Sequence, residues 1–357
     1  MDEPAPNDAN NEPLSAPDSI EALEEMLSAP TPELIESLSE LEGDIALLGV
    51  GGKMGPTMAR MAVRALREAG RPNRVIGVSR YSDEAVRQRL EDWGVQTVSC
   101  DLLDADSVAQ LPDAAHVISM SGFKFGAKEH PELAWATNCY LPALVCRRYQ
   151  DSRIIAFSTG NVYGLTTPGS GGSRESDPPA PIGEYAHTAL GRERMFEFFA
   201  RRQQTPVLML RLNYATELRY GVLVDLAQQI KQGQPVSVEM GHVNVIWLHD
   251  ANLMTLRALG LPPRQDTPYD VLNLAGQEIL SVRKVCQQLA QRMGCEADLV
   301  GEEAPHALLN NGRAAYPLLG EPQVDAETMI DWTADWVAGG GELLGKPTHF
   351  EVRDGKF

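Results

Sequence analysis

Two kinds of hydrophobic spacing alternate along the first half of the chain. Short apolar runs predict β-strands, and segments whose apolar residues recur at helical spacing predict α-helices. We expect strands at 45–50, 74–79, 96–100, 115–120 and 153–158, and helices at 53–69, 83–92, 105–111 and 131–149. This alternation is typical of a parallel sheet covered by helices on both faces. The pattern predicts an α/β fold with a Rossmann-type, doubly wound parallel sheet.

The second half of the chain mixes the two spacings. A loop rich in Gly, Pro and Ser (166–181) precedes a long helix at 184–202 and a strand at 206–212 that would complete the sheet. Later elements are helices at 220–232, 281–293 and 325–337, and strands near 235–238, 243–247 and 270–274. We interpret residues 44–212 as the Rossmann domain and 213–357 mainly as a smaller C-terminal lobe, interleaved with that domain.

Residues 1–43 form an acidic N-terminal extension. Its first part, 1–17, is rich in Pro, Asn, Asp and Glu and is expected to be disordered. Between 18 and 41, apolar residues at helical spacing predict two short amphipathic helices packed on the body. Residues 1–44 contain 13 Asp or Glu and no Lys or Arg, so they supply most of the net charge of −18. The rest of the chain is only mildly acidic and lacks the basic surface that nucleic acids require.

Several other classes of protein are disfavoured by the sequence. No apolar stretch approaches the roughly 20 residues of a membrane span, and the acidic N-terminus does not resemble a secretory signal. The five cysteines show no paired spacing, which indicates reduced thiols and a cytoplasmic protein. The histidines show no metal-ligand spacing, and Ser158–Thr159 lacks the serine-hydrolase elbow. We expect no metal, membrane or nucleic-acid partner.

A glycine turn between the first predicted strand and helix carries the strongest chemical signal. Gly49, Gly52 and Gly55 punctuate it, with Lys53 and Met54 between the last two. Glycines in this position let the backbone approach a pyrophosphate, which then sits against the free N–H groups of the helix N-terminus. The strand–turn–helix–strand context predicts a dinucleotide site, and the alternative is a turn that serves packing alone.

Further motifs follow the glycine turn in a recognisable order. They are Asp101–Leu102 at the end of the third strand, FSTGNVYG (157–164), Tyr185 with Glu193 after it, LRLNY (210–214), the region around His249–Asp250, and VLNLAGQEILSV (271–282). Over about residues 44–295 the chain resembles the extended short-chain dehydrogenase/reductase family, which includes nucleotide-sugar epimerases and dehydratases. The resemblance implies an NAD(P)-binding domain, with Asp101 and Leu102 near the adenine ring, and a C-terminal substrate-binding lobe.

The resemblance also implies catalytic roles. Thr159 falls where the family places the hydroxyl that orients the substrate oxygen, and Tyr185 falls where it places the proton-exchanging tyrosine. The family's lysine, four residues after the tyrosine, is replaced by Ala189. Because a free tyrosine has a pKa of about 10, its ionisation at neutral pH requires roughly 4 kcal/mol of stabilisation from another source.

Lys124 is the replacement cation that the sequence suggests. It lies in SMSGFKFG (119–126), which resembles the G-x-K stretch beside the cofactor in UDP-galactose 4-epimerases, so Ser121 and Gly122 become cofactor candidates. The alternative is that Lys124 is a solvated loop residue. His187 lies on another face of the helix from Tyr185, and we interpret it as a surface residue.

The cofactor type depends on the end of the second strand. Ser79–Arg80 stands where NAD-binding relatives usually carry an acid, and a hydroxyl followed by a guanidinium suits the 2′-phosphate of NADP. We therefore favour NADP over NAD. The alternative is that Arg80 points to solvent and the site accepts both cofactors.

The substrate is less closely defined. Asn213 aligns with an asparagine that contacts sugar nucleotides in related epimerases, and Tyr214 follows it; alternatively, Asn213 only satisfies a turn. The stretch Gly241–Asn252 lacks the arginine that grips a nucleotide diphosphate in those relatives, so a free sugar, sugar acid or other small polyol or carbonyl compound fits at least as well. Arg211 and Arg219 are candidates either for binding an anionic substrate group or for structural ion pairs.

We interpret the protein as an NAD(P)-dependent oxidoreductase or epimerase-type enzyme that acts on a sugar or another small hydroxyl or carbonyl compound by hydride transfer. Because of Ala189, a dinucleotide-binding regulator or scaffold without catalysis is the alternative. By resemblance, the helices at 131–149 and 184–202 would form a homodimer interface; the alternative is that their apolar faces pack only within one subunit.

Overall fold

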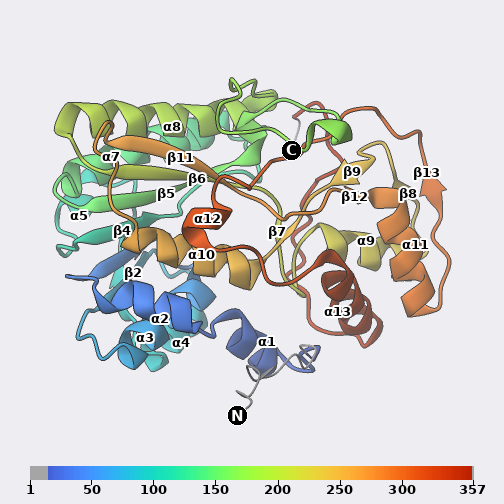
Figure 1. Cartoon of the computed structure of the whole chain (residues 1–357), viewed down its shortest axis with the longest axis horizontal. Helices are drawn as coiled ribbons and strands as arrows, with labels where there is room; N and C mark the ends of the chain where they lie inside the picture. Colours follow the sequence, from blue (N-terminus) through green and yellow to red (C-terminus); the bar gives the residue numbers. More distant parts are fainter. Residues whose placement is uncertain (1–14, 356–357) are drawn as a thin grey trace, which may run out of the picture.

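A seven-stranded parallel sheet forms the centre of the molecule, as expected (Figure 1). The computed structural model describes residues 15–355, so most of the segment expected to be disordered, 1–17, lies outside the described residues. The strand order is β3-β2-β1-β4-β5-β6-β11. These strands are β1 (Ile45–Leu48), β2 (Val75–Ser79), β3 (Gln96–Ser99), β4 (His116–Ser119), β5 (Arg153–Thr159), β6 (Val207–Leu212) and β11 (Tyr269–Leu274).

The sheet extends one strand further than expected. The strand at 206–212 does not complete it, because β11 pairs in parallel with β6 over its whole length and forms the edge. The connection from β6 to β11 passes through much of the second lobe, and such a long-range pairing leaves no local signal in the sequence.

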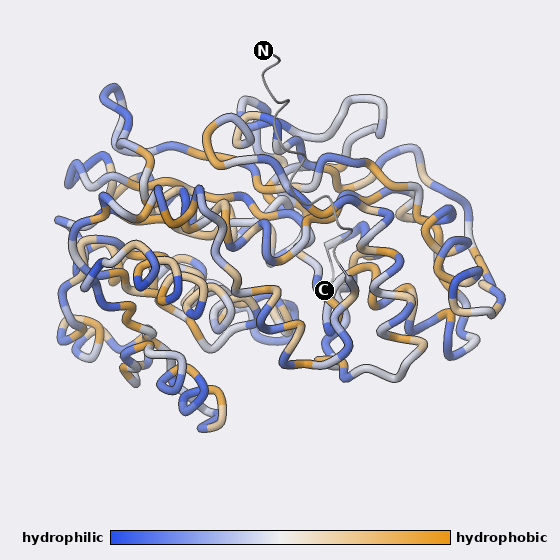
Figure 2. Tube along the Cα trace, turned by 60° about the horizontal axis from the view of Figure 1, so that its bottom comes forward, coloured by the Kyte–Doolittle hydropathy of each residue, from blue (hydrophilic) through white to orange (hydrophobic). Residues whose placement is uncertain are grey.

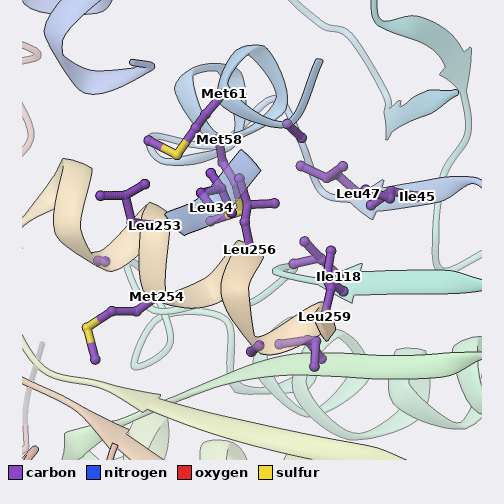
Figure 3. Packing of buried hydrophobic residues seen from close by; sticks show 14 of the residues in the cluster. Leu34, Ile45, Leu47, Met58, Met61, Ile118, Leu253, Met254, Leu256 and Leu259 are labelled. Carbon is purple, nitrogen blue, oxygen red and sulfur yellow. The ribbon is translucent and has the colours of Figure 1, made fainter. Parts of the chain in front are cut away.

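One face of the sheet is covered by α3 (Gly55–Glu68), α4 (Glu84–Asp92), α10 (Leu248–Gly260) and the N-terminal α2 (Pro32–Ser39). Figure 3 shows side chains of α2, α3 and α10 meeting those of β1 and β4 in one hydrophobic cluster. Helix α10 was not expected. Its residues are buried nearly all round, so its sequence lacks the amphipathic stripe that marks a surface helix.

The opposite face is covered by α5 (Ala105–Ala109), α7 (Leu141–Arg148) and the long α8 (Gly183–Gln203). The helix expected at 131–149 is three consecutive segments: α6 (Pro131–Trp135), a π-helical turn (Ala136–Tyr140) and α7. The π-helical turn contains the buried Asn138, whose side chain hydrogen-bonds to Phe123 after β4 and to Thr188 of α8.

The second lobe packs three helices against one another, α9 (Val222–Lys231), α11 (Val282–Met293) and α13 (Ala326–Ala338). Short strand pairs border them: β7 (Ala215–Thr216) with β10 (Ile246–Trp247), β9 (His242–Val243) with β12 (Leu280–Ser281), and β8 (Val236–Ser237) with β13 (Leu299–Val300). A short helix, α12 (Tyr316–Leu319), lies beside α10. In Figure 2 the hydrophobic segments gather in the interior of both lobes.

Both N-terminal helices expected between 18 and 41 are present and pack on the body. Helix α1 (Ile20–Leu27) buries Leu23 and Leu27 in the core of the second lobe, whereas α2 joins the core beneath the sheet. Each starts with a hydroxyl N-cap, Ser19 and Thr31, and the cap at Thr31 with Pro32 after it starts the second helix anew. Within residues 15–355, none of the helices combines the length and apolar character that a bilayer crossing requires.

Candidate functional site

A cleft of about 1130 Å³ opens at the carboxyl ends of the central strands. Its walls come from the glycine turn after β1, the loop after β4, the ends of β5 and β6, and the first half of α8. The C-terminal segment Leu344–His349 lines the cleft on the side of the second lobe. Ligands of open α/β sheets bind at this edge, where the connections diverge to the two faces.

The glycine turn follows its expected geometry. Gly49 adopts a φ of +89°, and its N–H donates to the carbonyl of Val78 at 2.8 Å. A Cβ at Gly55 would lie 2.0 Å from the carbonyl oxygen of Val50, so only glycine permits α3 to start this close to the strand. The first turn of α3 carries no acidic residue and no side-chain cap, which leaves its N-terminal dipole available to an anion.

Thr159 and Tyr185, the two residues predicted to be catalytic, both line the cleft. Thr159 ends β5, and its hydroxyl oxygen accepts hydrogen bonds from the backbone N–H and side-chain amide of Asn161, which fixes its rotamer. Tyr185 lies in the first turn of α8 and is almost fully buried.

The side chains next to Tyr185 differ from those that the family resemblance implies. Ala189 packs in a small apolar cluster with Val162 and Tyr163. One helical turn further, the buried Arg192 lines the cleft and donates to the carbonyl of Phe157 at 2.9 Å and to Asn138 Oδ1. Sequence reasoning missed Arg192, although its position seven residues after Tyr185 places both on one helical face.

Three lysines gather around the cleft. Lys53 Nζ lies 3.2 Å from the ring centroid of Tyr220 and 4.7 Å from that of Phe125, so two aromatic faces hold it. Burial, with repulsion from Lys124 and Lys346, lowers the pKa of Lys53 to about 7. Burial also lowers the pKa of Lys124 to about 8.

Lys124 is therefore not a solvated loop residue. Its Nζ donates to the carbonyl of Thr348 at 3.0 Å and lies 5.9 Å from the ring centroid of Tyr185. Thr348 in turn donates its N–H and hydroxyl to Asp225. These contacts fasten the C-terminal segment across the cleft.

The N-terminal extension contributes a carboxylate to the cleft. Glu24 of α1 contacts Arg89 at 2.9 Å and Arg219 at 3.3 Å, and Arg219 also pairs with Glu217 at 3.1 Å. All four residues line the cleft. Arg219 therefore stands in an ion-pair network that still faces the site.

Arg211 has a structural role instead. It forms a buried ion pair with Glu193 at 2.7 Å and also donates to the hydroxyl of Tyr163, and the opposite charge of Glu193 holds its pKa above the ordinary value despite burial. Asn213 lines the cleft, and its amide donates to Asn244 Oδ1 at 2.8 Å. Tyr214 lines it as well, with a φ of +40°.

The remaining candidates divide into two groups. Gly52, Lys53, Met54 and Gly122 line the cleft, whereas Ser79, Arg80, Asp101, Leu102 and Ser121 are not part of its wall. Ser79 and Ser121 back the glycine turn, since Cβ atoms at Gly51 and Gly49 would meet their hydroxyl oxygens at 2.7 and 2.5 Å. Arg80 is exposed, and His187 is exposed as expected.

The sequence model of one family matches the chain. It is described as the NAD dependent epimerase/dehydratase family, and the match covers residues 45–251. No curated protein matches the chain.

Solved structures of similar fold are numerous. One is MoeE5 in complex with UDP-glucuronic acid and NAD, at 20% identity and a TM-score of 0.66, covering 84% of this chain and 100% of that one. A second is UDP-glucuronic acid 4-epimerase from Bacillus cereus with UDP-glucuronic acid and NAD, at 17% identity and 0.69, covering 83% and 99%. A third is the dTDP-glucose 4,6-dehydratase DesIV from Streptomyces venezuelae, at 17% identity and 0.69, covering 83% and 97%.

Proposed function

Because the chain belongs to the NAD dependent epimerase/dehydratase family, we propose that it is an enzyme that oxidises or reduces a sugar-like hydroxyl or carbonyl compound with a nicotinamide dinucleotide. The observation that carries this proposal is one cleft that combines the glycine turn with Thr159 and Tyr185. The fold alone would not carry it, since one fold supports many chemistries.

The residues of the cleft fit such a cofactor. The Gly55 position, which a Cβ would fill, brings the N-terminus of α3 close to the cleft, so Gly52, Lys53 and Met54 would hold a diphosphate. Gly122 and Lys124 would flank the end of the cofactor nearest Tyr185. The bound nicotinamide would supply a hydride acceptor or donor.

The side chains of the chain itself would do the proton chemistry. The fixed hydroxyl of Thr159 would donate a hydrogen bond to the reacting oxygen of the substrate and orient it. Tyr185 would take the proton from a substrate hydroxyl, or return one to a carbonyl, as a general base or acid. Burial in this cleft excludes water and strengthens both interactions.

Two observations bear on the choice between NAD and NADP. The three similar structures contain NAD, and Arg80, on which the preference for NADP depends, is exposed. Arg89 lines the cleft but is paired with Glu24. We propose a nicotinamide dinucleotide site whose preference for NADP depends on whether Arg80 turns toward the 2′-phosphate.

For the substrate, we propose a sugar-like compound with an anionic group. Lys124 and Lys346 lie close enough to Lys53 to repel its charge in a protein of net charge −18, and a bound carboxylate or phosphate would relieve that repulsion. Asn213 and Tyr214 would contact its hydroxyl groups. Residues 213–357 would mainly form the lobe that binds this substrate. Two copies of the chain would pair through α6 and α8.

The test has two stages. Calorimetric titration of nucleotide-stripped protein with NAD⁺ and NADP⁺ should show binding of at least one, and Gly55→Val should abolish it. The saturated protein is then screened with neutral and anionic sugars for reduction of the nicotinamide, with Tyr185→Phe expected to lose at least ~100-fold in rate. Binding without turnover of any compound would favour the non-catalytic alternative, and absence of binding would contradict both.

A further inference from the structure

Glu24 of α1 is a buried carboxylate in the wall of the cleft. Only 7% of its surface is exposed, and it comes from the N-terminal extension, outside the Rossmann domain. Arg89 of α4 and Arg219 both donate to its Oε1, at 2.9 and 3.3 Å. Within residues 15–355, no hydrogen bond uses its Oε2. The carboxylate therefore keeps an oxygen that can accept a hydrogen bond from a ligand.

Helix α1 is held on both sides of Glu24. Its Leu23 and Leu27 are fully buried in the core of the second lobe. Its Glu25 pairs with two arginines of α3, at 2.8 and 2.7 Å. The second lobe and the helix that starts at the glycine turn thus fasten α1 together, which gives Glu24 a defined place in the cleft.

The order of the strands shows at which end of the cleft Glu24 lies. Thr159 ends β5, on the β4 side of β1, whereas α4 follows β2 on the other side. A dinucleotide with its diphosphate at the turn after β1 and its nicotinamide beside Thr159 would extend its adenosine toward β2. Arg89 of α4, and Glu24 in contact with it, therefore lie at the adenosine end.

The charges at this end suit a ribose hydroxyl better than a phosphate. Asp83, the N-cap of α4, and Glu217, the partner of Arg219, line the cleft together with Glu24. Both arginines are already paired, Arg89 with Glu24 and Arg219 with Glu24 and Glu217. A 2′-phosphate would face these carboxylates and would have to displace one of them from an arginine, whereas a 2′-hydroxyl would find an acceptor.

We propose that Glu24 discriminates between cofactors: its carboxylate accepts a hydrogen bond from the 2′-hydroxyl of the adenosine ribose and disfavours a 2′-phosphate, so that the site binds NAD in preference to NADP. Dinucleotide folds usually place an acid for this purpose about 20 residues after the glycine turn. Ser79–Arg80 stands there in this chain, and the N-terminal extension supplies the acid instead. The inference rests on the proposed function, because the cleft must bind a nicotinamide dinucleotide.

Two other residues compete for this role. A 2′-phosphate held by the exposed Arg80 would reverse the preference, and a ribose held by Asp83 would leave Glu24 without effect. Asp83 is also exposed, and its Oδ1 accepts the N–H of Ala85 as the cap of α4. Glu24→Gln and Asp83→Asn each remove one charge and retain an acceptor oxygen, so they separate the two carboxylates.

The experiment is a calorimetric titration of nucleotide-stripped protein with NAD⁺ and NADP⁺, and with 5′-AMP and adenosine 2′,5′-bisphosphate. We expect the wild type to bind NAD⁺ and 5′-AMP at least ~10-fold more tightly than their 2′-phosphorylated counterparts, because like charges at close range disfavour the wrong ligand. Glu24→Gln should remove most of that difference. Glu25→Gln is the control, since it makes the same charge change on the same helix outside the cleft wall, and it should keep the wild-type ratios.

Each outcome decides the proposal. A wild type that binds the 2′-phosphorylated ligands as tightly as the others overturns it without any variant. Ratios that folded Glu24→Gln leaves unchanged, or that Glu25→Gln or Asp83→Asn alters to the same extent, overturn it as well. Expected ratios without turnover of any sugar would leave the role of Glu24 standing and the proposed enzyme activity wrong; turnover with ratios insensitive to Glu24 would give the reverse. Absence of binding by all these nucleotides overturns both.

Discussion

Lys53 occupies an unusual place for an ammonium group. It stands in the turn that would receive a diphosphate, between two aromatic rings and near two other lysines. Without an anion, its charge is opposed by burial and by its neighbours, which is why its pKa falls to about 7. Between about pH 7 and pH 10 the folded protein therefore binds fewer protons at this residue than the unfolded chain does.

We expect Lys53→Met to stabilise the unliganded protein most at or below pH 7. The unfolded lysine titrates at about pH 10.4, so the cost of the charge is complete below 7 and fades as the pH rises toward 10. Thermal unfolding should show Lys53→Met melting roughly 2–4 °C higher at pH 7, with the gap closing by pH 10. The exposed Lys128→Met is the control and should show no such trend; a gap that is constant with pH would contradict the explanation.

For single residues, the sequence predicted which ones lie at the cleft better than it predicted what they contact. Thr159, Tyr185, Asn213 and the glycines line the cleft because motif positions translate directly into positions at strand ends. Arg192 was missed because its place in the cleft wall depends on hydrogen bonds to Phe157 and Asn138, which only the folded chain brings near it. The same reason left both roles of Arg211 open until its ion pair with Glu193 was seen.

The glycine turn and α3 form the element on which cofactor binding depends. Gly55 lies where the helix meets the carbonyl of Val50, so any side chain there must push α3 away from β1. The free helix N-terminus, the diphosphate site and the packing of Met58 and Met61 all depend on that one contact.

Gly55→Ala should therefore reduce stability and cofactor affinity together. We expect a loss of about 1–3 kcal/mol in the free energy of unfolding, because the clash is with backbone atoms. Gly169→Ala is the matched control, since nothing lies within 4 Å of its added Cβ, and it should stay within ~0.5 kcal/mol of wild type. Chemical denaturation measures the free energy of unfolding of both variants. Equal stability of the two would show that α3 tolerates displacement.

Elements with a clear period were predictable, and those without one were not. Helices such as α3 and α11 bury one stripe, and their expected bounds agree with the structure to within about two residues. Helix α10 is buried all round, and β7, β12 and β13 are two-residue strands that exist only through pairing. Tertiary contacts, not local sequence, create these elements.

An exposed apolar surface bears on the assembly of the whole molecule. Leu133, Trp135 and Tyr140, from α6 and the following turn, and Phe198 of α8 are 42 to 53% exposed. These segments lie side by side and are the helices for which the family resemblance implies a dimer interface. Large apolar side chains gathered on neighbouring helices are typical of protein interfaces.

We expect the protein to be a homodimer that Trp135→Glu together with Phe198→Glu dissociates. Charges placed in the apolar centre of an interface should weaken association by at least ~100-fold, which sedimentation velocity would detect as a monomer at micromolar concentration. Charges at the exposed Val300 and Leu318, away from these helices, are the control. A wild-type monomer at high concentration would contradict the dimer.

The acidic N-terminal extension also matters for how this protein is prepared in the laboratory. Expression plasmids are often shortened to remove a stretch so rich in proline and acid. Cutting past Glu24 would strip away the carboxylate that Arg89 and Arg219 share. Arg219 would keep Glu217, whereas the guanidinium of Arg89 would be open to whatever anion the buffer contains. Apparent ligand preferences of such a trimmed protein would then report on the missing helix as much as on the enzyme.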